Sequence, residues 1–192
     1  MNLQTSRAVG GIGALLIVLG VIPGFIGISD YGAVRAIGII FILISLYKLA
    51  NIHKNKSIFT NAFIGGAIII GSTFVSTLAI ENWLMSSLPD FNNISAILSF
   101  VGTLLTVFIV FVIFLIIAAF FVRRSLNELA VCSDTDQFAG TGKLLLVGAV
   151  LTIIAIGILI VMIAFIMLAI AFFKMKEPQH TPPATIEPTT TI

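Results

Sequence analysis

Long apolar runs separated by short polar joints dominate this chain of 192 residues. The first four runs lie at about residues 8–28, 33–50, 60–80 and 95–122. Each has roughly the 17 to 25 residues that a helix needs to cross a bilayer. The pattern therefore predicts an all-α fold, a polytopic transmembrane helical bundle.

The last apolar run, Leu144 to Phe173, has thirty residues without a charge. As one straight helix it would measure about 45 Å, whereas the hydrocarbon core is about 30 Å thick. A reversal near Gly157 would divide it into spans at about 143–156 and 158–173 and give six spans. One tilted helix would give five. The reversal has a weak point, because its apolar residues offer few polar partners to the freed backbone groups.

The basic residues favour six spans, since cytoplasmic joints retain Lys and Arg. With both termini inside, nine of the ten basic residues lie in the cytoplasm and only Arg35 lies outside; five spans give seven against three. We expect a cytoplasmic N-terminus, with Lys54 and Arg124 on the same side and Asp90 outside.

Residues 177–192 are rich in Pro and Thr and lack apolar periodicity, which predicts a disordered tail after a transmembrane domain at 1–176. Such a tail can also be an external O-glycosylated stalk, which would fit the five-span alternative.

Composition agrees with a membrane location. The chain is 59% hydrophobic and 9% charged, against about 45 to 50% and about 25% in soluble domains. We expect the cell membrane, with membrane lipids, the chain itself or other membrane proteins as partners, and no nucleic acid. The single cysteine, Cys132, excludes an internal disulfide.

Two polar joints resemble each other. The sequence from Ser45 reads SLYKLANIHKNKSIF and the sequence from Ser125 reads SLNELAVCSDTDQF, so both contain S-L-x-x-L-A followed by a Phe. One gap aligns Phe59 with Phe138. This similarity predicts a parallel internal repeat. Leu126, Leu129 and Ala130 would then face lipid or neighbouring helices, while Asn127 and Glu128 meet water.

Four segments carry a family resemblance: AVGGIGALLIVLG, KNKSIFTNAFIG, RRSLNELA and TGKLLLVGAVLTIIAIGILIVMIAFIMLAIAFF. Their order and spacing resemble an archaeal family of uncharacterised membrane proteins, domain of unknown function family 996. The resemblance implies an archaeal cell membrane and several helices, and it brings no activity and no functional residues. The segment from Glu81 to Asn93 and the tail after Lys176 do not match.

No catalytic, cofactor or metal site is predicted. Gly140 to Lys143 lacks the first glycine and the Ser or Thr of a phosphate-binding loop. His53 and His180 have no metal-ligand partner at helical spacing. Asp134 and Asp136 are two residues apart, so they do not share a helix face.

The remaining polar residues have structural interpretations beside functional ones. Arg35 anchors the outer end of a span, and the hydroxyls within the helices bond to their own backbone. The joint from Lys48 to Lys56 either holds anionic headgroups or serves topology alone. Asn93-Ile94-Ser95 is a glycosylation sequon beside a span, and the sequence does not decide whether it is used.

Glycines predict close helix packing. Gly20 and Gly24 have the G-x-x-x-G spacing, and Gly66, Gly71, Gly102 and Gly148 mark further small sites. If Gly20 faces another helix rather than lipid, we expect Gly20→Ile to destabilise the bundle more than Gly157→Ala, because overpacking a close contact commonly costs about 1 to 3 kcal/mol.

These features favour a non-enzymatic scaffold or accessory subunit that packs through small-residue helix faces. The alternative is a channel or carrier for a neutral or lipid-like solute. A dry, filled interior would favour the scaffold.

Overall fold

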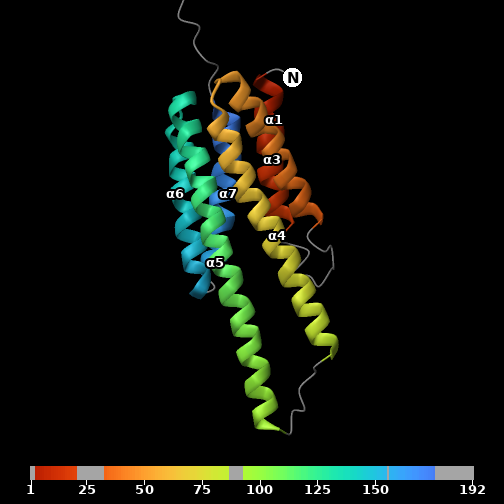
Figure 1. Cartoon of the computed structure of the whole chain (residues 1–192). Helices are drawn as coiled ribbons and strands as arrows, with labels where there is room; N and C mark the ends of the chain where they lie inside the picture. Colours follow the sequence, from red (N-terminus) through yellow and green to blue (C-terminus); the bar gives the residue numbers. More distant parts are fainter. Residues whose placement is uncertain (1–2, 21–32, 87–92, 155, 176–192) are drawn as a thin grey trace, which may run out of the picture.

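The computed structural model describes residues 3–20, 33–86, 93–154 and 156–175 of the chain, with side chains omitted at residue 77 and residues 79–86. These residues form six α-helices and one short 3₁₀ helix (Figure 1). The elements are α1 (Leu3–Leu19), α3 (Ala33–Ile52), α4 (Lys56–Ser86), α5 (Ile94–Ser133), α6 (Asp136–Leu151), η1 (Thr152–Ile154) and α7 (Gly157–Lys174). The predicted all-α class of apolar helices is confirmed, and the described residues contain six α-helices.

The helices pair as three antiparallel hairpins that close into a ring. The pairs are α1 with α3, α4 with α5, and α6 with α7. Helix α3 packs on α4, α5 on α6, and α7 returns to α1. Each helix therefore has two neighbours, and the chain order is also the order around the ring.

Glycines allow the two helices of a hairpin to approach closely. A Cβ added at Gly13 would lie 2.8 Å from the carbonyl oxygen of Gly38, and one at Gly65 would lie 2.9 Å from that of Ala118. Small residues bring helix backbones together where lipid supplies no hydrophobic drive between helices. The close contacts of the first two hairpins follow from these positions.

The main core lies at the end of the ring where the hairpins are joined to one another. All six helices contribute buried apolar side chains to it, including Ala14, Leu49, Ile58, Leu129, Phe138 and Phe172. The rings of Phe138 and Phe172 meet edge to face, with centroids 5.3 Å apart. This end of the bundle is filled with apolar side chains.

The thirty-residue apolar run reverses direction, as the six-span alternative requires. Helix α6 leads through η1 into α7, and the two helices pack against each other. Some of the backbone groups freed by the reversal do find polar partners. The N–H of Thr152 donates to the Ala149 carbonyl, and the Thr152 hydroxyl donates to the Gly148 carbonyl at 2.9 Å. Backbone and hydroxyl groups thus bond within the turn.

The α4–α5 hairpin is longer than the other two. Helix α4 has 31 residues and α5 has 40, whereas α1, α3, α6 and α7 have 16 to 20. At about 1.5 Å per residue, α5 is about 60 Å long. Its far end and that of α4 extend well past the other hairpins in Figure 1.

Five of the described helices are long and apolar enough to cross a membrane, and α1 is a shorter apolar helix. This arrangement fits a multi-pass membrane protein. Arg7, Lys54, Lys56 and Arg124 lie at the joined end, whereas Arg35 lies beside Gly20 at the opposite end of α1 and α3. Which side of the membrane this end faces stays a prediction.

Some expectations from the sequence fall outside the described residues. They concern Gly24, Asp90, His180 and the tail.

The expected ranking of Gly20→Ile above Gly157→Ala stays a prediction, but the geometry favours the opposite order when both glycines are replaced by alanine. A Cβ at Gly20 would meet the Arg35 side chain at 2.6 Å and the Arg35 backbone nitrogen at 3.0 Å, whereas one at Gly157 would collide outright with the backbone of Thr152 and Gly148. Backbone in a tight reversal cannot move aside as a side chain can. Gly71 and Gly102 also depart from expectation, since nothing lies within 4 Å of a Cβ at either position.

Gly157→Ala should therefore destabilise the bundle more than Gly20→Ala, by at least the roughly 1 to 3 kcal/mol of an overpacked site. Gly102→Ala is the matched control, and it should leave stability unchanged or raise it, because alanine favours a helix over glycine by about 0.5 to 1 kcal/mol. Thermal unfolding in detergent measures all three. Equal midpoints for Gly157→Ala and Gly102→Ala would contradict this account of the reversal.

Candidate functional site at the two joints

The structure corrects the alignment of the internal repeat. The gap that paired Phe59 with Phe138 is wrong, because α4 begins at Lys56 and α6 at Asp136, 80 positions later, the same shift that relates Ser45 to Ser125. Under this constant shift Phe138 corresponds to Ile58. Both side chains are fully buried, whereas Phe59 is only partly buried. We refer to residues 48–56 as the α3–α4 joint and to residues 128–136 as the α5–α6 joint.

The two joints also share backbone geometry. Lys54 and Asp134 are the two non-glycine residues with positive φ in the described chain, at 52° and 48°. Each follows a helix, and the N–H of the next residue donates a hydrogen bond to the carbonyl of the last residue of the S-L-x-x-L-A motif. The Asn55 N–H donates to Ala50 at 2.9 Å, and the Thr135 N–H donates to Ala130 at 3.2 Å. Left-handed residues of this kind commonly end helices.

The serine of each motif ties two helices together. The Ser45 hydroxyl donates to the Ser6 carbonyl at 2.7 Å, and the Ser125 hydroxyl donates to the Ile58 carbonyl at 2.6 Å. Both serines are fully buried. Ser45 thus departs from the expectation that helical hydroxyls bond their own backbone, whereas Thr73, Thr103, Thr106 and Thr152 follow it.

The apolar residues of the second motif are buried. Leu126, Leu129 and Ala130 all belong to the main core. Of the two surroundings expected from the sequence, lipid or neighbouring helices, these residues face neighbouring helices. Helix α5 continues without a break through Arg123 and Arg124 to Ser133, which carries the motif into the bundle.

Charge is reversed between the joints at every ionic position. Three lysines of the α3–α4 joint correspond to three carboxylates of the α5–α6 joint under the same shift: Lys48 to Glu128, Lys54 to Asp134 and Lys56 to Asp136. The repeat thus keeps its buried residues and inverts its charges.

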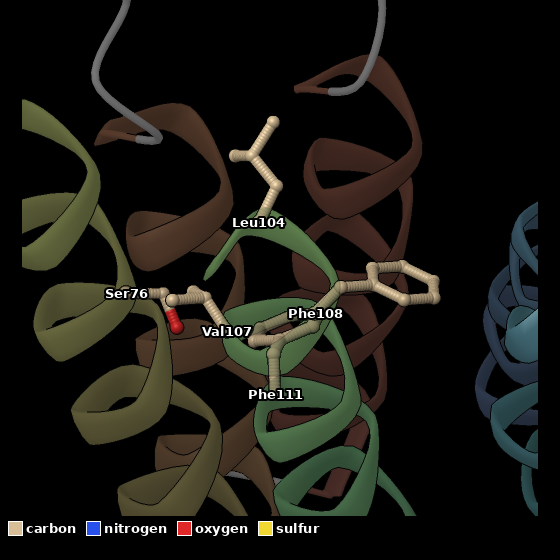
Figure 2. A pocket seen from close by; sticks show the side chains of 5 residues that line it. All are labelled: Ser76, Leu104, Val107, Phe108 and Phe111. Carbon is tan, nitrogen blue, oxygen red and sulfur yellow. The ribbon is translucent and has the colours of Figure 1, made fainter. Parts of the chain in front are cut away.

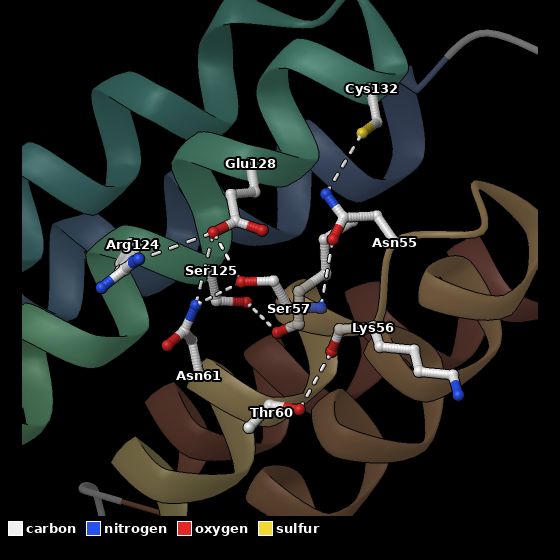
Figure 3. Close-up of polar contacts among 10 residues, drawn as sticks. Asn55, Lys56, Ser57, Thr60, Asn61, Arg124, Ser125, Glu128 and Cys132 are labelled. Carbon is white, nitrogen blue, oxygen red and sulfur yellow. Dashed lines mark hydrogen bonds and ion pairs between the residues drawn. The ribbon is translucent and has the colours of Figure 1, made fainter.

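Glu128 anchors a polar cluster between α4 and α5 (Figure 3). Its Oε1 accepts a hydrogen bond from the Ser57 hydroxyl at 2.7 Å and from the Asn61 amide at 3.4 Å. The Arg124 guanidinium lies 3.8 Å away, and the Glu128 side chain is only 25% exposed. The expectation that Glu128 simply meets water is wrong, because it accepts bonds from the next helix.

Asn55 immediately precedes α4 and lies beside this cluster. Its side-chain oxygen accepts from the N–H of Ser57 at 3.0 Å, and its amide points at the sulfur of Cys132, 3.9 Å away. A shallow hollow of about 250 Å³ is lined by Asn55, Asn127, Glu128, Val131 and Cys132. The partly buried Glu128 carboxylate therefore joins α5 to α4 through its hydrogen bonds with Ser57 and Asn61, and we refer to this cluster as the clamp.

His53 lies at the end of α3 in the α3–α4 joint. Burial lowers its pKa from the usual 6.5, because desolvation disfavours the charged imidazolium. Its Nε2 is buried without a hydrogen-bond partner among the described residues. In that part of the chain no three His, Cys, Asp or Glu side chains are grouped to hold a metal ion.

The glycine-rich segment Gly140 to Lys143 lies inside α6. The Thr141 hydroxyl donates to the Gln137 carbonyl at 2.8 Å within the same helix. A phosphate-binding loop needs N–H groups that are free of helical bonds. This segment has the helical conformation of its neighbours instead.

Two further polar residues act at helix ends. Arg7 donates to the Phe173 carbonyl at 3.1 Å, near the C-terminus of α7, where helical carbonyls lack internal partners. Asn93 caps α5 by accepting from the N–H and hydroxyl of Ser95 at 3.1 Å and 2.7 Å. The sequon asparagine is thus part of a helix cap.

An apolar cavity of about 440 Å³ opens between α4 and α5, away from the joints (Figure 2). Ser76 lines it from α4, and Leu104, Val107, Phe108 and Phe111 line it from α5. Pockets of about 300 to 1,000 Å³ with mostly apolar walls commonly hold small ligands. From the sequence, the Ser76 hydroxyl was considered only as one of several within the helices, and the four apolar residues were not singled out, because nothing separates them from other lipid-facing positions.

Comparison with known proteins assigns the chain to a family. The profile of a protein family of unknown function, DUF996, matches residues 34–166. The chain belongs to the DUF996 family. It is also 26% identical to the uncharacterised protein MJ1644 of Methanocaldococcus jannaschii over 180 residues, which cover 92% of this chain and 95% of that protein. No solved structure matches the fold.

Replacing Glu128 with Ala should lower the free energy of unfolding by about 1.5 to 3 kcal/mol, the usual cost of losing hydrogen bonds to a charged group. Asp136→Ala is the matched control, since Asp136 is exposed and should change stability by about 0.5 kcal/mol or less. Thermal unfolding in detergent at neutral pH compares them. An equally small effect of both would show that the clamp is unimportant.

His53 should make the bundle less stable as the pH falls. Its folded pKa is lowered, so the unfolded chain binds the proton more readily below about pH 6.5. The stabilisation is present above that pH and is lost as the pH falls toward the folded pKa. His53→Gln should flatten this part of the pH profile of unfolding. Parallel profiles for the two proteins would rule out a His53 contribution.

Proposed function

We propose that this protein is a non-enzymatic membrane scaffold or accessory subunit, located in the cell membrane with its joints in the cytoplasm. It packs through exposed helix faces against copies of itself or other membrane proteins. The basic residues at the joined end support this orientation through the retention of Lys and Arg in the cytoplasm.

The observation that carries the proposal is the contrast between the two ends of the bundle. At the joined end, side chains from all six helices fill the interior, which leaves little room for a solute path. At the far end, the α4–α5 hairpin presents large apolar side chains, with Ile94 82% and Leu98 72% exposed. A filled interior at the joined end, together with an extended apolar exterior, suits packing against other helices.

A second function is favoured by the cavity between α4 and α5. Its apolar walls and the Ser76 hydroxyl suit a lipid-like molecule with one polar group. In this alternative the protein binds or carries such a solute along the hairpin, and the filled core anchors the hairpin in the membrane.

Site-specific photo-crosslinking in native membranes tests the scaffold. A crosslinker at Leu98 or Val101, both exposed on α5, should give adducts of defined protein mass. The same group at Leu126, which is buried in the core, is the control and should give none. Adducts with lipid alone at both exposed positions would contradict the scaffold.

Filling the cavity separates the two functions. Val107→Trp places a large side chain in the cavity, so it should abolish binding of a fluorescent fatty-acid or isoprenoid probe if the carrier alternative holds. The protein adducts at Leu98 should persist in this variant if the scaffold holds. Probe binding by wild type that disappears in Val107→Trp would favour the carrier.

A further inference from the structure

At two of its three positions, the charge reversal between the two joints matches no ion pair within the described residues. Lys54, Lys56, Asp134 and Asp136 are exposed, and none of them forms an ion pair with the part of the chain that the structure describes. We propose that two copies of this chain dock side by side, so that the α3–α4 joint of each copy meets the α5–α6 joint of the other.

The order of helices around the ring places the two joints where a two-fold symmetric contact can pair them. One joint precedes α4 and the other follows α5, so the two flank the α4–α5 hairpin at the same end of the bundle. A two-fold axis along the membrane normal, beside this hairpin, brings the basic joint of one copy opposite the acidic joint of its partner, twice. A two-fold interface requires such a self-complementary surface.

The surface between the joints is apolar and exposed. Phe63 and Ile70 on α4 are exposed, as are Ile113 and Phe120 on α5. The paired joints would set the register of two copies at the membrane surface, and the apolar faces would supply contact area below. Complementary charges mainly determine register and partner choice.

Membrane topology explains only half of this charge pattern. Retention in the cytoplasm and attraction to anionic headgroups both account for Lys54 and Lys56. Neither accounts for Asp134 and Asp136 at the corresponding positions, which anionic headgroups would repel. A second copy of the chain would form favourable charge contacts with both joints, whereas anionic lipid would contact only the basic one. Charge complementarity therefore favours a second copy over lipid as the binding partner of this surface.

The experiment uses charge-reversed variants of the full chain. Lys54→Asp with Lys56→Asp makes both joints acidic, and Asp134→Lys with Asp136→Lys makes both basic. Each backbone position accepts the new residue, because the other joint already carries a residue of that charge in the same conformation. The four changes together exchange the exposed charges of the two joints, at positions 54, 56, 134 and 136, and leave the net charge unaltered.

Energy transfer between two fluorescently labelled populations in neutral phosphatidylcholine vesicles measures self-association. The acidic variant alone and the basic variant alone should associate at least about tenfold more weakly than wild type, equivalent to a few exposed charge pairs. A mixture of the two variants should associate as wild type does, and so should the fourfold exchange. Salt near 1 M, where the screening length is about 3 Å, should weaken wild-type association.

A matched control changes the same number of charges elsewhere. Lys143→Asp with Lys174→Asp alters the net charge as the acidic variant does but leaves both joints intact, so its association should equal that of wild type. Association that weakens in this control as much as in the acidic variant would mean that net charge matters and the joints do not. That result would overturn the proposal.

The inference rests on the proposed scaffold function. The experimental outcomes distinguish failure of docking through the joints from failure of the scaffold function itself. Equal association of all variants would overturn docking through the joints and leave the scaffold intact, with contact through apolar faces alone. A monomeric wild type in vesicles with and without anionic lipid would also overturn the inference. Crosslinking at Leu98 in native membranes would then decide the scaffold on its own.

Discussion

The close approach of the two helices in each hairpin is the interaction on which the rest of the bundle depends. Gly13, Gly65 and Gly148 each lie in the first helix of a hairpin, and an added Cβ would come within 3.0 Å of the backbone of the second helix in every case. Lipid tails are as apolar as leucine, so helices gain little by burying leucine against one another. Tight backbone contact supplies the attraction instead, and it makes the hairpin the unit of this fold.

Hairpins assembled in this way can differ in length without disturbing their common core. All three enter and leave at the joined end, where Leu49, Leu129 and Phe172 pack together. The opposite ends of the paired helices lie at the far end, where α5 extends beyond the shorter α6 and α7. Variation at these ends therefore changes how far each hairpin reaches into the membrane, whereas variation in the joints would disturb every helix.

The sequence predicted the features that follow from length and charge. Thirty apolar residues are too long for one span, and the basic residues at its two ends favour a reversal. The register of the repeat was missed because Phe59 and Phe138 look equivalent, whereas the helix starts at Lys56 and Asp136 show that Ile58 takes the buried place. Glu128 was missed because its partners Ser57 and Asn61 lie on another helix, and sequence spacing carries no information about that contact.

The repeat shows which constraints act on its two surfaces. Leu46 and Leu126, like Leu49 and Leu129, are identical and buried, because the core at the joined end tolerates little change in volume. The polar positions of the two joints are not constrained in this way, because most of them lie at least partly at the surface. Instead each lysine corresponds to a carboxylate, which makes the end of the bundle electrically asymmetric around the ring. An asymmetric surface can bind its own copy through a two-fold axis, whereas two joints of like charge would repel theirs.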